Sequence, residues 1–145
     1  MVTQLQYDPG RGGAFWESVR ALPGYPHGDQ VRLRRMIFES NAVRRLPEVL
    51  RGVGTQPDAP LLVVMDETPM RRAGDDLKPL ILKLVQVAGW SPEEVIARPG
   101  ADGQVHTDLE QIERVQSRLR PGCTVLALGA GTITDIPIHA CHRLE

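Results

Sequence analysis

The sequence has few of the residues that mark the more specialised classes of protein. Its two cysteines, Cys123 and Cys141, are too few for a disulfide framework and are typical of a reducing compartment. The net charge of −1 gives no electrostatic case for binding nucleic acid or an anionic membrane surface. No apolar run approaches the roughly 18 residues that span a bilayer, and the N-terminus lacks the apolar middle of a signal peptide. These absences predict a cytoplasmic protein that binds neither nucleic acid nor membrane.

The composition is otherwise that of an ordinary globular domain, with 41% hydrophobic residues in a chain of 145. That length is enough for one domain with a substantial core. Residues 1–30 are rich in glycine and proline, and within them residues 14–22 have apolar side chains at helical spacing. We therefore expect residues 1–30 to form an arm with a short helix, and residues 31–145 to form the globular domain.

Apolar runs of strand length alternate with amphipathic segments along residues 31–145. Residues 61–65 are apolar at every position, which is typical of a strand covered on both faces by helices in a parallel sheet. The regular alternation with short connections implies right-handed crossovers and an α/β, Rossmann-like three-layer domain with a mainly parallel sheet. The predicted strands are 31–39, 61–65, 94–97 and 124–128, and the helices between them are 42–51, 75–88 and 109–119.

Three prolines bear on where the predicted helices begin. Pro47 falls inside the pattern of residues 42–51 and is expected to bend that helix or to shift its start. Thr68, followed by Pro69, has the pattern of an N-cap and a first helical residue. Pro137 fits only the first turn of a helix, so the last helix is expected to begin near Thr134 or to be kinked.

Two of the predicted strands end in residues that suit a ligand, because ligands of open α/β sheets bind beyond the carboxyl ends of the strands. Asp66 follows residues 61–65, where a carboxylate can accept both hydroxyls of an adenosine ribose or can cap a helix near Thr68. Residues 129–132 (Gly-Ala-Gly-Thr) follow the last strand. Small residues at a helix N-terminus suit a pyrophosphate, although the same turn can join a strand to a helix without any ligand.

The order of these two features departs from the usual dinucleotide fingerprint, in which the glycine turn comes first and the acid about 20 residues later. Here the acid comes first and the glycine turn last. With the segments MIFESNAVRRLPEVL, VVMDET and LALGAGTITD, this order resembles the N-terminal half of the iron-containing alcohol dehydrogenase superfamily. That group includes glycerol dehydrogenase, glycerol-1-phosphate dehydrogenase and 3-dehydroquinate synthase. The segment GAGTITDI is most similar to the glycerol-1-phosphate dehydrogenase branch.

The resemblance implies an NAD-binding domain of a metal-dependent polyol or glycerol-phosphate dehydrogenase. In this family pattern Asp66 contacts the adenosine ribose, Asp135 lies near the nicotinamide, and the pyrophosphate is held by Gly129, Ala130, Gly131 and Thr132. The negative charge of Asp66 disfavours the 2′-phosphate of NADP, so NAD is the expected cofactor. Pro137 and Ile138 stand where many dehydrogenases of the family have Ala-Lys, a departure in the substrate or nicotinamide region.

Family members also have a C-terminal helical domain that holds a divalent metal through an aspartate and two histidines, and no stretch of this sequence supplies that set. His139 and His142 share a helix face without a third ligand, so we interpret them as helix-packing residues. The sequence ends in Leu144–Glu145, a common vector-derived ending. We therefore expect a fragment that is inactive alone, that needs a missing C-terminal domain for its metal, and that forms a homodimer through the surface this domain would cover.

Two other functions remain open at this point. One is a domain of a lyase similar to 3-dehydroquinate synthase, which uses NAD transiently. The other is a stand-alone, non-catalytic module that binds a nucleotide, a small anion or a partner subunit.

Overall fold

The computed structural model describes Glu17, Ala21, Ile37 and residues 39–142. The chain divides into two compact units, Met1–Arg45 and Leu46–Glu145. Most of the strand predicted at residues 31–39 and most of the helix predicted at residues 14–22 lie outside the described residues. Ile37 and Glu39, which are described, do not belong to a strand. Within the latter segment, the Ala21 N–H donates to the Glu17 carbonyl at 3.1 Å, which is the spacing of a helical hydrogen bond.

The second unit is built on a three-stranded parallel sheet. Strand β1 (Leu61–Met65) lies at its centre, between β4 (Pro92–Ile96) and β5 (Thr124–Leu128). The three strands end together, since Met65 lies opposite both Ile96 and Leu128. All five residues of β1 are buried, as expected for a strand covered on both faces.

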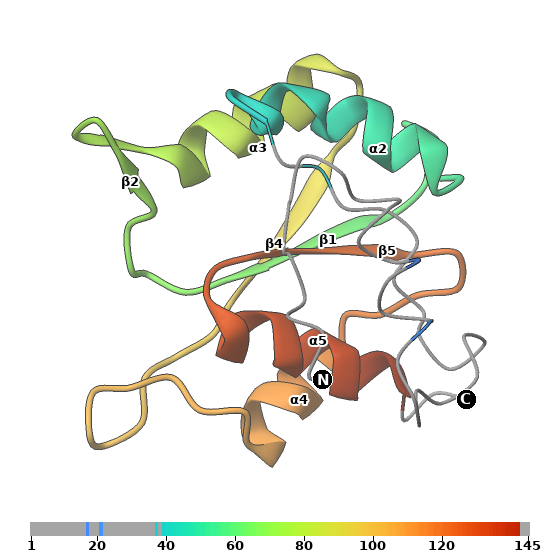
Figure 1. Cartoon of the computed structure of the whole chain (residues 1–145). Helices are drawn as coiled ribbons and strands as arrows, with labels where there is room; N and C mark the ends of the chain where they lie inside the picture. Colours follow the sequence, from blue (N-terminus) through green and yellow to red (C-terminus); the bar gives the residue numbers. More distant parts are fainter. Residues whose placement is uncertain (1–16, 18–20, 22–36, 38, 143–145) are drawn as a thin grey trace. The chain divides into compact units, whose positions relative to one another are not determined.

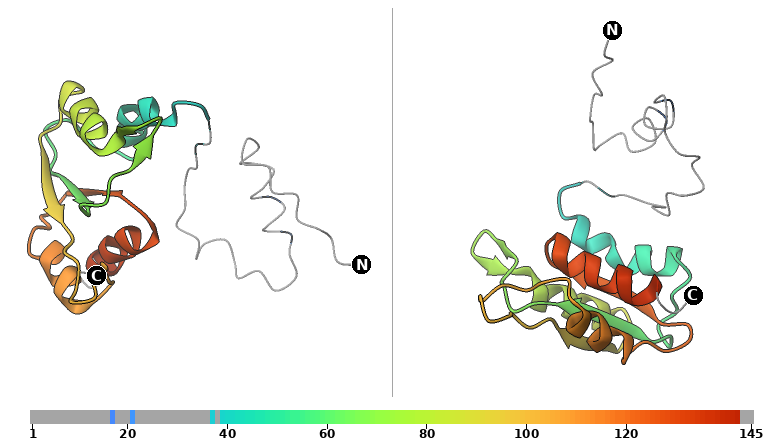
Figure 2. Two further views of the ribbon diagram at one scale, coloured as in Figure 1. Left: turned by 90° about the vertical axis from the view of Figure 1, so that its left-hand side faces the viewer. Right: turned by 90° about the horizontal axis from the view of Figure 1, so that it is seen from below.

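Helices cover the two faces of the sheet and complete a three-layer arrangement (Figures 1 and 2). Helices α2 (Leu46–Gly52) and α3 (Leu77–Val87) lie on one face, and α4 (Leu109–Gln116) and α5 (Gly131–His142) lie on the other. The core between the sheet and α4 and α5 contains Leu62, Val64, Val95, Ala97, Ile112, Val115, Ile133, Ile136 and Ala140. The predicted α/β, Rossmann-like fold with a parallel sheet is therefore confirmed.

The connections that follow β1 and β5 leave the sheet toward opposite faces. Strand β1 leads to α3 on one face, whereas its neighbour β5 leads to α5 on the opposite face. Because the connections leave the adjacent strands in opposite directions, a crevice opens between the carboxyl ends of β1 and β5. Asp66 follows β1 and the turn at residues 129–132 follows β5, so both predicted ligand-binding segments lie at this crevice.

Several helix starts differ from those predicted. A 3₁₀ helix, η3 (Ala42–Arg45), precedes α2 along the chain, and Pro47 then stands in the first turn of α2. The predicted shift of the helix start at Pro47 is confirmed, because a proline in the first turn removes an N–H group that has no helical acceptor. Thr68 is not an N-cap, and that prediction is wrong.

A hairpin follows Thr68, where the N-cap pattern predicted the start of a helix, and the helix predicted at residues 75–88 is α3 (Leu77–Val87). Strands β2 (Arg71–Arg72) and β3 (Asp75–Asp76) pair in antiparallel fashion, and the turn between them places Ala73 at φ 50° and Gly74 at φ 93°. Two consecutive positive φ angles are the geometry of a tight hairpin turn. Helix α3 begins only after this hairpin, and its N-cap is Asp76, whose side chain accepts a hydrogen bond from the Lys78 N–H at 3.1 Å.

Helix α5 begins at Gly131 and contains Pro137 in its interior, so the first of the two predicted alternatives, a start near Thr134, is wrong. Proline at this position removes the hydrogen bond to the Ile133 carbonyl. Ile133, Ile136 and Pro137 are all buried. Burial of these side chains against the sheet outweighs the lost hydrogen bond, which local helix propensity could not anticipate.

Candidate nucleotide-binding cleft

A cleft of about 590 Å³ lies at the carboxyl edge of the sheet. At this edge the chain passes from β5 into α5, on the left in Figure 1. Segments that follow all three strands line it: Asp66, Glu67, Thr68 and Pro69 after β1; Ala97, Pro99, Gly103, Gln104 and Val105 after β4; and Ala130, Thr132 and Ile133 after β5. Residues far apart in the sequence therefore share one concave surface.

Lysine 78, in the first turn of α3, holds Asp66 at the edge of this cleft. The Lys78 ammonium forms an ion pair with Asp66 Oδ1 and donates to the backbone carbonyls of Asp66 and Thr68, both at 2.6 Å. Lys78 is only 5% exposed, and the side chain of Asp66 is 17% exposed. Asp66 is therefore part of a partly buried ion pair and does not cap a helix near Thr68, because the β2–β3 hairpin follows that residue.

The ion pair also determines the charge of Asp66. Desolvation acts to raise the pKa of its carboxyl, but hydrogen bonds from Lys78 and from the side chain of Thr68 outweigh it and hold the pKa below the usual value. Asp66 therefore presents a carboxylate to the cleft at neutral pH, and a carboxylate accepts hydrogen bonds from hydroxyl groups.

The two glycines of the turn after β5 differ in the contacts that a side chain would make there. A Cβ atom at Gly129 would lie 2.7 Å from both Cβ and Cγ1 of Ile133, which is closer than real side chains approach. A Cβ atom at Gly131 would meet no described atom within 4 Å. Packing therefore requires glycine at position 129, whereas no contact in the described part of the chain requires it at position 131.

Gly131 is the first residue of α5, and Ala130 holds the N-cap position, with its carbonyl accepting from the Thr134 N–H at 3.2 Å. The first N–H groups of a helix have no acceptor within the helix, and they attract negative charge. With no side chain at Gly131, an anionic group can approach these N–H groups closely.

The structure brings some of the predicted site residues together and leaves one apart. Asp66, Ala130 and Thr132 line the same cleft, and Gly129 and Gly131 flank Ala130 in the turn. Asp135 is exposed on α5 and does not line the cleft.

The loop between β4 and α4 is a part of the site that the sequence patterns did not reveal. The Asp102 carboxylate accepts from the Gln104 N–H at 3.0 Å and pairs with His106 Nε2 at 2.7 Å. These two contacts, the first from Gln104, lower the pKa of Asp102. The Thr107 hydroxyl donates to the Thr132 carbonyl at 3.5 Å and links the loop to α5.

A smaller cavity of about 290 Å³ lies at the opposite, amino edge of the sheet. Its two arginines, Arg118 and Arg120, both pair with Glu93, at 3.0 and 3.3 Å. Their charge is partly compensated within the chain, and the cavity lies away from the edge at which α/β sheets bind ligands. We therefore assign the candidate site to the larger cleft.

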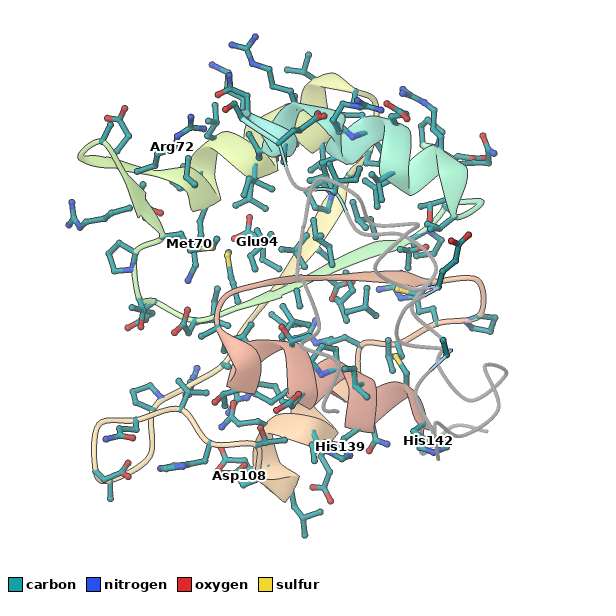
Figure 3. All side chains as sticks on the ribbon, viewed as in Figure 1. Met70, Arg72, Glu94, Asp108, His139 and His142 are labelled. Atoms are coloured by element: carbon teal, nitrogen blue, oxygen red, sulfur yellow. The ribbon has the colours of Figure 1, made fainter. Side chains whose placement is uncertain are left out.

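In the part of the chain that the structure describes, no group of three or more histidine, cysteine or acidic side chains is arranged to hold a metal ion. His139 and His142 lie toward the end of α5 that is distant from the glycine turn (Figure 3), and Cys123 and Cys141 are not joined in a disulfide. No helix among the same residues has the length and apolar character needed to cross a membrane.

Comparisons of the chain with models of protein families, with curated proteins and with solved structures found no match. An assignment of function therefore depends on the residues of the cleft and on the family resemblance of the sequence.

Proposed function

We propose that the cleft binds NAD, and that this chain is the nucleotide-binding domain of a metal-dependent polyol or glycerol-phosphate dehydrogenase of the iron-containing alcohol dehydrogenase superfamily. The observation that carries the proposal is that Asp66 and the turn after β5 line one cleft, at the position where ligands of α/β sheets bind. The resemblance of the sequence to that superfamily supplies the choice of cofactor.

The chemistry of the cleft fits two parts of an adenosine diphosphate group, the ribose and the pyrophosphate. The Asp66 carboxylate suits the hydroxyls of the ribose, since it is ionised and held in place by Lys78. The open N–H groups at the start of α5 suit the pyrophosphate, because they are donors beside the positive end of the helix dipole. The residues present therefore fit NAD.

We assign this chain the binding and orientation of the cofactor and no other step of the reaction. NAD supplies the hydride acceptor when it is bound, and the protein supplies its position and surroundings. In the family pattern the metal that polarises the alcohol belongs to the helical domain.

Calorimetric titration with NAD and NADP tests the proposal. We expect NAD to bind at millimolar concentration or below, and NADP to bind about tenfold more weakly, because the carboxylates of Asp66 and Glu67 both face the cleft and repel a 2′-phosphate. Absence of binding by both nucleotides at millimolar concentration would refute the proposal. Tighter binding of NADP would refute the preference for NAD.

The variant Ala130→Asp separates phosphate binding from folding. Aspartate is among the preferred N-cap residues, so it is expected to stabilise α5 by about 1 kcal/mol while its charge occupies and repels the phosphate position. We expect NAD binding to weaken at least tenfold with no loss of thermal stability. Gln56→Asp is the matched control, because it adds the same charge at an exposed position before β1, at the other edge of the sheet. Equal effects of the two variants would contradict a phosphate site at the start of α5.

A further inference from the structure

Lys78 is an unusual residue in this fold, since lysine is rarely buried unless it is paired. It is 5% exposed, and its ammonium directs three hydrogen bonds to one short segment, the two residues Asp66 and Thr68 that follow β1. An ammonium has three donors, so all of them are used on this segment. Lys78 therefore holds both the backbone of the segment and the carboxylate of Asp66.

Lys78 lies outside the cleft and contacts the residues that line it. Asp66 and Thr68 line the cleft, whereas Lys78 does not, so the lysine contacts them from the side away from the ligand space. The β2–β3 hairpin sets the start of α3, and Asp76 caps it by accepting from the N–H groups of Met70 and Lys78, both at 3.1 Å. The lysine is thus placed by a rigid local structure and not by the ligand.

We infer that Lys78 is a positioning residue that directs the Asp66 carboxylate toward a ribose hydroxyl of a bound nucleotide. This inference rests on the proposed function and assigns the residue behind its ribose site. A carboxylate has about four lone-pair positions, and Lys78, Thr68 and the backbone of Asp66 use three of them, so a position remains for a ribose hydroxyl. Lys78 keeps the carboxylate ionised and fixes its direction, whereas Asp66 itself contacts the ligand.

The inference predicts a dependence on pH that a purely structural lysine would not produce. The charged groups around the carboxylate are Lys78 from α3 and Glu67 from the same segment, and the cleft lining after β4 and β5 carries no titratable side chain. Without Lys78, desolvation would raise the pKa of Asp66, opposed only by hydrogen bonds from the Thr68 side chain and from the backbone of Asp66 itself. Protonation of Asp66 would then weaken ribose binding within the mildly acidic range.

The test compares Lys78→Met with Lys83→Met, which removes an exposed lysine of the same helix. Two quantities are measured in the same preparations: the titration of the Asp66 carboxyl carbon by NMR without nucleotide, and NAD affinity by calorimetry at pH 5.5 and pH 8. For Lys78→Met we expect Asp66 to titrate at higher pH and NAD affinity to fall at least tenfold, with the larger loss at pH 5.5. For Lys83→Met and the unchanged protein we expect the same NAD affinity at both pH values.

A conservative variant keeps the test decisive if Lys78→Met fails to fold. Lys78→Arg retains the charge but replaces a compact ammonium with a planar fork, so we expect Asp66 to remain ionised while NAD affinity falls at least threefold. The inference is overturned if the unchanged protein binds NAD and the folded Lys78 variants bind it equally well at both pH values. If the unchanged protein does not bind NAD, the proposed function itself fails, and the inference fails with it.

Discussion

Replacement of Gly129 by alanine tests the most restrictive contact in the cleft. The added Cβ atom would lie 2.7 Å from two atoms of Ile133, and ordinary contact begins at 3.4 Å, so the strand end and the helix must separate by about 0.7 Å. Ile133 is 2% exposed and belongs to the core between the sheet and α5, where neighbouring side chains leave little room for such a shift. Overpacking of this kind typically costs about 1–3 kcal/mol.

The measurement is urea and thermal unfolding of the purified protein, followed by circular dichroism. For a domain of about 100 residues, 1 kcal/mol corresponds to roughly 4 °C or more, so we expect Gly129→Ala to melt at least about 4 °C lower. Gly131→Ala is the matched control, because its Cβ atom meets no described atom within 4 Å. Its stability should remain equal or rise by up to about 1 kcal/mol, since alanine favours the helix.

Each variant has an outcome that would contradict the role assigned to its glycine. Equal melting temperatures for Gly129→Ala and the unchanged protein would show that the contact with Ile133 is not what requires glycine. A loss in Gly131→Ala as large as that in Gly129→Ala would show that the two glycines share one role. If the proposed function is correct, Gly131→Ala should weaken NAD binding even though its stability is preserved.

Two further predictions concern the structure that places Asp66. Asp76→Ala removes the N-cap of α3 and the acceptor of the Met70 N–H, so urea unfolding should show that the free energy of unfolding falls by about 1–2 kcal/mol. Asp75→Ala, at an exposed position, is the control and should change the free energy of unfolding by less than about 0.5 kcal/mol. Asp66 has a folded-state pKa below its unfolded value of about 3.9, so its contribution to stability is present above that pH and is lost as the pH falls through the folded-state pKa. Stability measured between pH 6 and pH 3 should therefore fall more steeply for the unchanged protein than for Lys78→Met, and parallel curves would contradict the ion pair.

Local patterns were sufficient for the bounds of two strands, whereas β4 (Pro92–Ile96) begins two residues before the predicted segment 94–97. Residues 61–65 and 124–128 were predicted with the bounds of β1 and β5, because each is a short apolar run bounded by turn residues. Helix α4 began at the predicted Leu109, since Asp108 caps it by accepting from the Gln111 N–H at 3.0 Å (Asp108 is labelled in Figure 3). A strong cap next to a periodic segment is a signal that the sequence itself carries.

The errors occurred where the backbone conformation depends on distant contacts. The hairpin after Thr68 requires a positive φ at Ala73, which alanine seldom adopts by itself. The start of α5 depends on burial of Ile133 and Ile136 against the sheet, which offsets the cost of Pro137. In both places local propensity pointed to a different structure, because it contains no information on the packing that decides the result.

The sequence by itself determined the α/β class and the placing of Asp66 and the glycine turn at strand ends, because hydrophobic periodicity and turn residues are local properties. Only the tertiary structure decided that β1 and β5 are neighbours, so that Asp66 and Ala130 line one cleft. It also decided that Lys78 is the partner of Asp66. The physical reason is that strand order and ion pairing join residues that are distant in the chain, and their energy depends on burial and geometry that no short segment encodes.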